Sequence, residues 1–451
     1  MLPDVFQTFL ERSPIAVMAQ AVVVNLFRPE RLDALFERTA QRQYQRSLMF
    51  SAVVGLMYSV VLGAVPSVYA AYRQRRQALK VSDQAVYDKL DGLEPGLSAA
   101  LVEDSARQAE AVIDALGARR APRLPGYRVR ILDGNHLAAT EHRLEPLRTR
   151  SEAPLPGKVL VVLDPETGLA THAFPTPDGH AQERVLLDGV LAEVRERDLW
   201  IADRNFCTLR LLFEVARKLG CFLLRQHGTI QGRLRGQRTF QGEGPTGKVY
   251  EQAIELEYEG EVRTFRRVTV ELHKATRDGA TTLHLLTNLT AEVTAERVAE
   301  LYAGRWSVET LFFEVTTTLT CEVATLCYPK AALFVFCLAL MAANAVAVLK
   351  AALRAAHGEA KADATSGYYL ALEIKQVQAG MLMVVPSTSW EELAHLEAGA
   401  FAVWLKALAA RVDLDPYRKS QRGPKRPPPQ RNRYRNGGHV STHKLLTGNG
   451  L

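Results

Sequence analysis

The spacing of apolar residues changes along this 451-residue chain, and each change marks a predicted boundary. Over residues 1–120 the apolar positions recur every three or four residues, which predicts helices throughout. From Tyr127 they alternate or form short runs, which predicts one strand ending at Asp133, a second over Lys158–Leu163 and a third returning from Leu169. Helix and strand patterns then alternate as far as Arg225.

A meander of three strands followed by alternating helix and strand is the ribonuclease-H-like pattern of the α/β class. Residues 229–287 interrupt it with strand-period segments between glycine-containing turns, beginning at Thr229-Ile230. We read them as an antiparallel β insertion that is rich in arginine: Arg233, Arg235, Arg238, Arg263, Arg266 and Arg267.

Helix-period patterns return after the insertion. They predict one long helix from Thr294 to about Leu319, another that opens at Pro329, and further helices over residues 367–411. We therefore expect an α/β protein in six parts: helices over 1–120, a ribonuclease-H-like core over 121–228 and 288–355, the insertion over 229–287, helices over 356–415 and a tail over 416–451.

The net charge of +7 is concentrated in this tail, which contains no acidic residue after Asp415. Nine Lys or Arg lie between Arg418 and Lys444, so the remainder of the chain is slightly acidic. A proline-rich basic segment cannot bury enough apolar surface to fold alone, and its charge suits a polyanion. We expect the tail to be disordered and to contact a polyanion, with Lys425, Arg426 and Arg431 among the contacting residues.

Cysteine usage and uncharged runs bear on the compartment. The five cysteines include no C-x-x-C pair, which argues against a disulfide framework and a structural zinc and favours a reducing cytoplasm. The start of the sequence has no charged segment followed by an apolar run, so no signal peptide is predicted. Ser47–Tyr72 and Ala331–Leu349 carry no charge and are long enough to span a membrane. Serines and Pro66 in the first, and Asn344 in the second, favour buried helices instead, and we expect no membrane partner.

Three acidic residues stand where a metal site would need them. Asp133 and Asp203 each follow an apolar strand, and Glu309 shares a helical stripe with Tyr302 and Arg305 at offsets of 0, 3 and 7. Carboxylate oxygens bind Mg²⁺, and two ions about 4 Å apart can clamp the attacking and leaving oxygens of a phosphodiester. The combination predicts an enzyme that cuts and joins DNA. Each residue taken alone has a structural alternative: a hairpin turn, a helix N-cap and a solvated helix face.

With these motifs the chain resembles a bacterial DDE transposase of the insertion-sequence-four family, over about residues 30–350 and the basic tail. The second aspartate of that family lies in a motif matched by Ala202-Asp203-Arg204-Asn205-Phe206, with asparagine in place of glycine. Its tyrosine, arginine, glutamate and lysine signature is matched by Tyr302, Arg305 and Glu309, whereas the lysine position is Thr316.

The resemblance implies that Asp133, Asp203 and Glu309 are catalytic and bind two Mg²⁺ ions, for which Mn²⁺ can substitute. Tyr302, Arg305 and Arg204 are then DNA contacts, as are Lys425, Arg426 and Arg431 of the tail. The helices over 1–120 and the insertion are expected to supply further DNA contacts. It implies a homodimer acting on double-stranded DNA, at terminal inverted repeats and a target, in the cytoplasm and associated with the nucleoid. Because the family's lysine helps to hold the transposon end, Thr316 predicts weaker end binding.

Two other functions fit the same residues. A metal-dependent nuclease with this core would cleave DNA without joining it. A DNA-binding protein derived from an inactive transposase would bind DNA in a salt-sensitive way, with no Mg²⁺-dependent chemistry.

Overall fold

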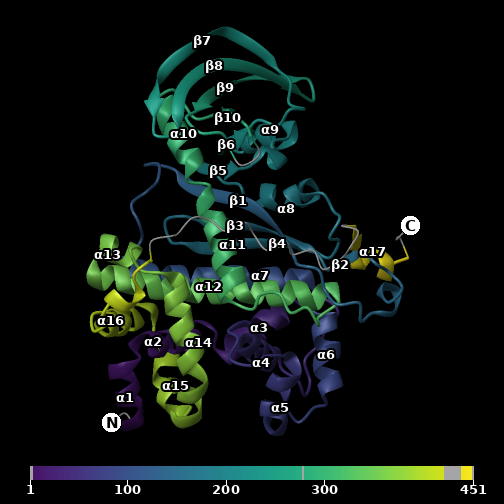
Figure 1. The fold of residues 1–451 in the computed structure, drawn as a ribbon, viewed down its shortest axis with the longest axis vertical. Helices are drawn as coiled ribbons and strands as arrows, with labels where there is room; N and C mark the ends of the chain where they lie inside the picture. The colour runs from purple at the N-terminus through teal and green to yellow at the C-terminus, as the bar shows by residue number, and fades with distance from the viewer. Residues whose placement is uncertain (1–3, 277–278, 421–437, 449–451) are drawn as a thin grey trace.

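One nine-stranded sheet runs through the molecule, and helices cover both of its faces (Figure 1). The structure is a computed structural model that describes residues 4–276, 279–420 and 438–448. The strand order is β4-β3-β1-β5-β6-β10-β9-β8-β7. The bounds are β1 Arg128–His136, β3 Lys158–Asp164, β4 Leu169–Thr176, β5 Asp198–Ala202, β6 Cys221–Arg225, β7 Arg233–Gly244, β8 Gly247–Tyr258, β9 Glu261–Leu272 and β10 Thr282–Thr287.

The five core strands β1, β3, β4, β5 and β6 confirm the predicted meander and the alternation that follows it. β1, β3 and β4 pair antiparallel, whereas β1, β5 and β6 pair parallel. Every residue of β3 is buried, and its side chains alternate between two cores. Val159, Val161 and Leu163 face the core that holds the long helices, and Leu160 and Val162 face α8 (Leu187–Glu193) and α9 (Leu209–Arg217).

The insertion continues the core sheet. Its last strand, β10, pairs antiparallel with β6, and β9, β8 and β7 follow in antiparallel order. The predicted strands of the insertion are thus present, with one correction: Thr229 and Ile230 form no strand, and the first strand begins at Arg233. Backbone hydrogen bonds therefore connect the outermost insertion strand to the core without a gap.

The helix expected from Thr294 to Leu319 is broken in two. α10 spans Ala295–Ala303 and α11 spans Trp306–Thr318, with Gly304 and Arg305 between them. A Cβ on Gly304 would lie 2.1 Å from Nη1 of Arg123, which donates a hydrogen bond to the Gly304 carbonyl. Glycine is the residue that allows this close approach, and it also weakens the helix at that point.

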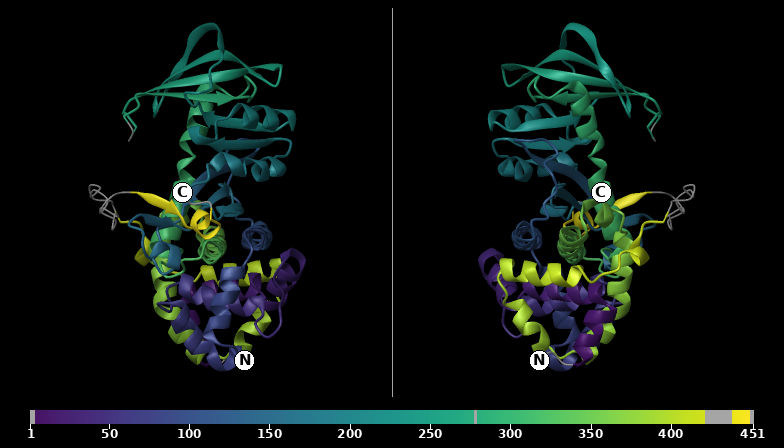
Figure 2. Two further views of the ribbon diagram at one scale, coloured as in Figure 1. Left: turned by 90° about the vertical axis from the view of Figure 1, so that its right-hand side faces the viewer. Right: turned by 90° about the vertical axis from the view of Figure 1, so that its left-hand side faces the viewer.

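The N-terminal and C-terminal helices, expected as separate regions, intermingle in one layer at the end opposite the insertion (Figures 1 and 2). The long helix α12 (Pro329–His357) lies in the middle of this layer and contacts helices from both regions, including α2, α4, α7 and α16. The other bounds are α1 Asp4–Arg12, α2 Pro14–Leu26, α3 Pro29–Thr39, α4 Phe50–Val61, α5 Val68–Leu79, α6 Asp83–Gly92, α7 Pro95–Ala115, α13 Glu359–Asp363, α14 Gly367–Val384, α15 Thr388–Ala394 and α16 Ala398–Ala409.

The two uncharged runs lie in this layer. Ser47–Tyr72 is divided between α4 and α5, whereas Ala331–Leu349 lies within α12. By length and composition, α12 could cross a membrane, and α1 and α2 pass the same test only as one bent pair. In α12, 89% of the most apolar window is buried inside the protein, as in the central helix of a helical layer.

The end of the tail is folded, which corrects the expectation of disorder over 416–451. β11 (His439–Ser441) pairs parallel with β2 (Ala153–Leu155), and α17 (Thr442–Leu446) follows. Ser441 and Thr442 are buried, and the Ser441 hydroxyl donates to Asp178 over 2.7 Å. Lys425, Arg426 and Arg431 lie outside the described residues.

Candidate functional site

The register of two parallel strands brings the two aspartates together. Leu132 of β1 pairs with Ala202 of β5, and Asp133 and Asp203 are the next residues on each strand. Asp203 directly follows β5, as predicted. Asp133 lies within β1 rather than at its end, because Gly134, Asn135 and His136 continue to pair with β3.

The break between α10 and α11 lies over these aspartates. The Tyr302 hydroxyl donates a hydrogen bond to Oδ1 of Asp203 over 3.4 Å. Arg305 donates through Nη1 to Oδ2 of Asp133 over 3.0 Å and through Nη2 to Oε1 of Glu309 over 2.8 Å. The five residues predicted from three separate segments therefore lie together as two adjacent hydrogen-bonded groups, Tyr302 with Asp203 and Arg305 with Asp133 and Glu309.

Burial shapes the electrostatics of this cluster. Burial raises the pKa of Asp133 to about 6, against the opposing effects of Arg305 and the Gly134 amide, and the charges of Glu309 and Asp203 add to the rise. Burial alone would lower the pKa of Arg305, but Tyr302 and the three carboxylates outweigh it and raise that pKa. Burial, together with Asp203, also raises the pKa of Tyr302. The guanidinium is thus held charged among acidic neighbours.

The three carboxylates suit a hard cation, but two of them are bound by Arg305 in this structure. Asp133, Asp203 and Glu309 offer only carboxylate oxygens, the ligands that Mg²⁺ prefers. Among the described residues, no group of three His, Cys, Asp or Glu is placed to hold a metal ion. The Arg305 guanidinium bridges Asp133 and Glu309, and its Nε is buried without a hydrogen-bond partner. A cation bound by Asp133 and Glu309 would have to displace Arg305 from both.

A cavity of about 710 Å³ opens beside the acids, between α10, α11 and the insertion. Asp203, Tyr302, Arg305 and Glu309 line one side. Cationic and apolar groups from β6, the end of β9 and the start of α11 line the rest, among them Arg225, Lys274 and Trp306. A cavity that joins carboxylates to basic side chains can receive an anionic chain next to a reacting centre.

The remaining predicted residues lie around this cluster. Arg204 is exposed in the short turn after β5. Thr316 is half-buried on α11, and its hydroxyl donates to the Phe312 carbonyl over 2.8 Å. Two other acids of the core, Asp164 and Asp188, have structural roles: Asp164 caps the turn after β3 through the Glu166 amide, and exposed Asp188 pairs with Arg210.

Sequence reasoning missed one acid near the site. A Cβ on Gly134 would lie 2.5 Å from Oε1 of Glu183, so Glu183 approaches the β1 backbone one residue beyond Asp133. Burial raises the pKa of Glu183, with an opposing effect of Lys158 and a further rise from Asp203. Glu183 lies in a short 3-10 turn, Glu183–Leu186, where no periodic pattern marks it. The one sequence feature that agrees with the approach of Glu183 to β1 is the glycine that follows Asp133.

Comparisons with known proteins bear on the same segment. Residues 124–345, just under half of the chain, match the family model described as the transposase DDE domain. No curated protein sequence matches the chain. Seven chains of solved structures match, among them the piggyBac transposase synaptic complex with hairpin DNA, solved by cryo-EM. That chain is 11% identical, with a TM-score of 0.38 over 87% of this chain and 85% of that one, a likeness too low to support a functional argument.

Proposed function

We propose that this chain, whose residues 124–345 match the transposase DDE domain, is a DNA transposase with Asp133, Asp203 and Glu309 as its catalytic acids. The observation that carries the proposal is the junction of β1, β5 and α11 around one guanidinium. Three carboxylates from segments spread over almost 180 residues meet there: Arg305 binds Asp133 and Glu309, and Tyr302 binds Asp203 on the neighbouring strand. The strand order β4-β3-β1-β5-β6 supports a ribonuclease-H-like core for this site.

The acids would hold two Mg²⁺ ions, or Mn²⁺ in their place, which would supply an activated water for cleavage and an activated 3′-hydroxyl for strand transfer. In this chemistry Arg305 would bind either the carboxylates or a phosphate of the DNA. In the structure it neutralises Asp133 and Glu309. When DNA enters the cavity, the planar guanidinium of Arg305 can turn to a phosphate and donate two parallel hydrogen bonds to it. The carboxylates are then released together, so DNA binding and exposure of the acids are coupled.

Tyr302 positions the second aspartate. Its hydroxyl, in a side chain that is 8% exposed, holds Asp203 from α10 while Arg305 holds Asp133 from the start of α11. The cavity beside them offers Arg225 and Lys274 to the phosphate backbone. Exposed Arg204 and the basic residues of the tail extend this contact in the proposal. We further propose that the protein acts as a homodimer that pairs two inverted repeats, in the cytoplasm and on the nucleoid.

The test is an excision assay on plasmid DNA that carries the flanking ends of the gene, with Mg²⁺, comparing the wild type with Asp203→Asn. The two proteins should bind the ends equally, because the amide still accepts from Tyr302, and only the wild type should excise. Equal excision by both proteins would remove Asp203 from the site.

The same assay separates the alternatives. Cleavage that never joins ends would identify a nuclease, and binding without any Mg²⁺-dependent cleavage would identify a protein that has lost catalysis. In that last case Thr316→Lys is the next variant, with Thr316→Leu as its uncharged control. The lysine should steepen the dependence of log K on log salt by about one unit. Excision regained by the lysine variant alone would locate the defect at that position.

A further inference from the structure

A second cavity lies in the helical layer, between α2, α4, α5, α14 and α15. Its volume of about 360 Å³ falls within the range of small-molecule pockets, roughly 300–1,000 Å³. The walls are mostly apolar, with Val24, Phe27, Val54, Tyr58 and Leu382 among them. None of the acids at the catalytic site lines it.

One guanidinium, that of Arg75, lines this apolar cavity, and the one carboxylate among the lining residues, that of the exposed Glu391, forms no ion pair with it. Arg75 of α5 makes no hydrogen bond or ion pair within the described parts of the chain, and its burial lowers its pKa. Gly55 of α4 provides the room, since a Cβ there would lie 3.1 Å from Nη1 of Arg75. A cation that is partly removed from water and has no anionic partner is costly, unless a ligand supplies that partner.

Two further polar groups in the wall also lack partners. Gln378 is 5% exposed and donates through Nε2 to Gln20 over 3.0 Å, while its Oε1 has no hydrogen-bond partner. Trp390 is 4% exposed, and its indole Nε1 is likewise unpaired. Buried polar atoms are normally paired, so the unpaired indole N–H of Trp390 marks a position where an acceptor atom of a ligand can bind, whereas Oε1 of Gln378 only accepts and offers nothing to an anion.

We propose that this cavity binds a small amphipathic monoanion, a medium-chain carboxylate whose head group pairs with Arg75 and whose chain lies along the apolar wall. One cation calls for one negative charge, and the indole N–H adds a donor for a carboxylate oxygen. Such a ligand would join α4 and α5 of the N-terminal region to α14 and α15 of the C-terminal region. It stabilises the folded state in proportion to the logarithm of its concentration above Kd.

The test uses the full chain and two probes of equal chain length, decanoate and decanol, with isothermal titration calorimetry. Decanoate should bind at least about tenfold more tightly than decanol, because only decanoate forms a charge-assisted hydrogen bond. Arg75→Met should remove that difference and leave decanol binding unchanged. Arg76→Met is the matched control, since Arg76 is an exposed neighbour on the same helix that does not line the cavity, and it should bind both probes like the wild type.

Thermal unfolding without ligand gives an independent readout. Removing an uncompensated charge should leave the melting temperature of Arg75→Met equal to or above that of the wild type. If this variant fails to melt cooperatively, Arg75→Lys replaces it, and it should retain a preference for decanoate. The proposal is overturned if neither probe binds the wild type, if decanol binds as tightly as decanoate, or if Arg75→Met keeps the preference.

Discussion

Nη1 of Arg305 lies 3.0 Å from Oδ2 of Asp133, a residue 172 positions earlier in the chain. The other arm of the same guanidinium binds Glu309, four residues further along. The cation therefore compensates two of the three proposed catalytic acids when DNA is absent. This arrangement explains how closely spaced carboxylates persist in a site where burial disfavours their charge.

Glu309→Gln should abolish strand cleavage while sparing DNA binding. The amide oxygen still accepts from Arg305, but the negative charge that would bind a cation is lost. We expect cleavage to fall by roughly two orders of magnitude or more, as when an electrostatic contact to the transition state is removed. Glu300→Gln, an exposed acid on α10 paired with Arg297, is the matched control and should cleave normally. Normal cleavage by Glu309→Gln would exclude the residue from catalysis.

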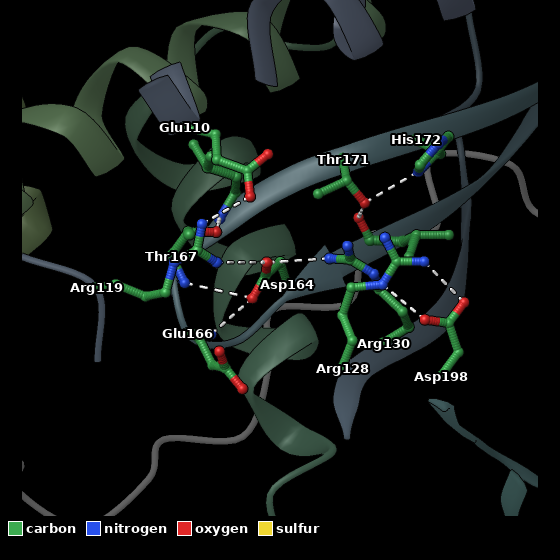
Figure 3. Close-up of polar contacts among 12 residues, drawn as sticks. Glu110, Arg119, Arg128, Arg130, Asp164, Glu166, Thr167, Thr171, His172 and Asp198 are labelled. Carbon is green, nitrogen blue, oxygen red and sulfur yellow. Dashed lines mark hydrogen bonds and ion pairs between the residues drawn. The ribbon is translucent and has the colours of Figure 1, made fainter. Parts of the chain in front are cut away.

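Asp164→Asn should destabilise the protein strongly, because it removes the counter-charge of a buried arginine. Oδ2 of Asp164 lies 3.0 Å from Nη1 of Arg130, and the side chains are 5% and 9% exposed (Figure 3). Breaking such a buried pair costs on the order of 3–5 kcal/mol of unfolding free energy. Urea denaturation measures this loss, and Asp188→Asn, at an exposed ion pair, should change stability by less than about 0.5 kcal/mol. Similar values for the two variants would contradict the prediction.

Asn344→Leu should destabilise the junction between α12 and the sheet. The Asn344 side chain accepts from the Ala170 amide over 2.8 Å and donates to the Ala170 carbonyl over 3.0 Å. β4 is the edge strand, so this amide satisfies backbone groups that no neighbouring strand pairs.

Leucine would leave both Ala170 groups buried and unpaired, at about 1–3 kcal/mol for each. Ser105→Ala is the graded control for Asn344→Leu. It removes only the hydroxyl that accepts from Nδ2 of Asn344 over 2.9 Å, and should cost about 1 kcal/mol in the same denaturation experiment. An Asn344→Leu protein as stable as the wild type would show that α12 does not need this contact.

Asp91→Asn should stabilise the protein at high pH and leave it unchanged at low pH. Burial, helped by the charge of Asp88, raises the pKa of Asp91 to about 7 from an ordinary value of 3.8. The folded state therefore binds the proton more tightly than the unfolded state. Wild-type stability should fall as pH rises from about 4 through 7, and the asparagine variant should escape that loss. Melting temperatures at pH 5 and pH 8 test this, and a difference independent of pH would refute it.

Local patterns predicted the parts of the fold that depend on neighbouring residues. The strand-period pattern read over residues 229–287 agrees with β8 and β9, because one face of each strand packs on a core and the other is polar. Asp203 directly follows β5, since an apolar run marks a buried strand and its end. Helical spacing placed Tyr302, Arg305 and Glu309 near each other, and they remain so although the helix is broken.

Features that depend on distant residues were missed. The break at Gly304 is contacted by Arg123, which lies 181 positions away and could not be placed there from local spacing. The folded end of the tail requires β2, and its own residues predicted only a basic, proline-rich segment. The continuity of the insertion with the core depends on the pairing of β10 with β6, which strand periodicity alone cannot assign. Glu183 enters the site through a short turn that carries no motif.

The intermingled helical layer has a consequence for synthesis of the protein. α2 buries Ile15, Val17 and Met18 in a layer whose other members include α12, α14, α15 and α16. The ribosome makes those helices roughly 300 residues later, a delay of about 15–60 s at ordinary elongation rates. For that time α2 can pack on α1 and α7, but the apolar surface that the later helices cover stays exposed. A shortened product that ends before Pro329 never acquires those helices, so truncation should yield aggregates or chaperone clients rather than a free N-terminal domain.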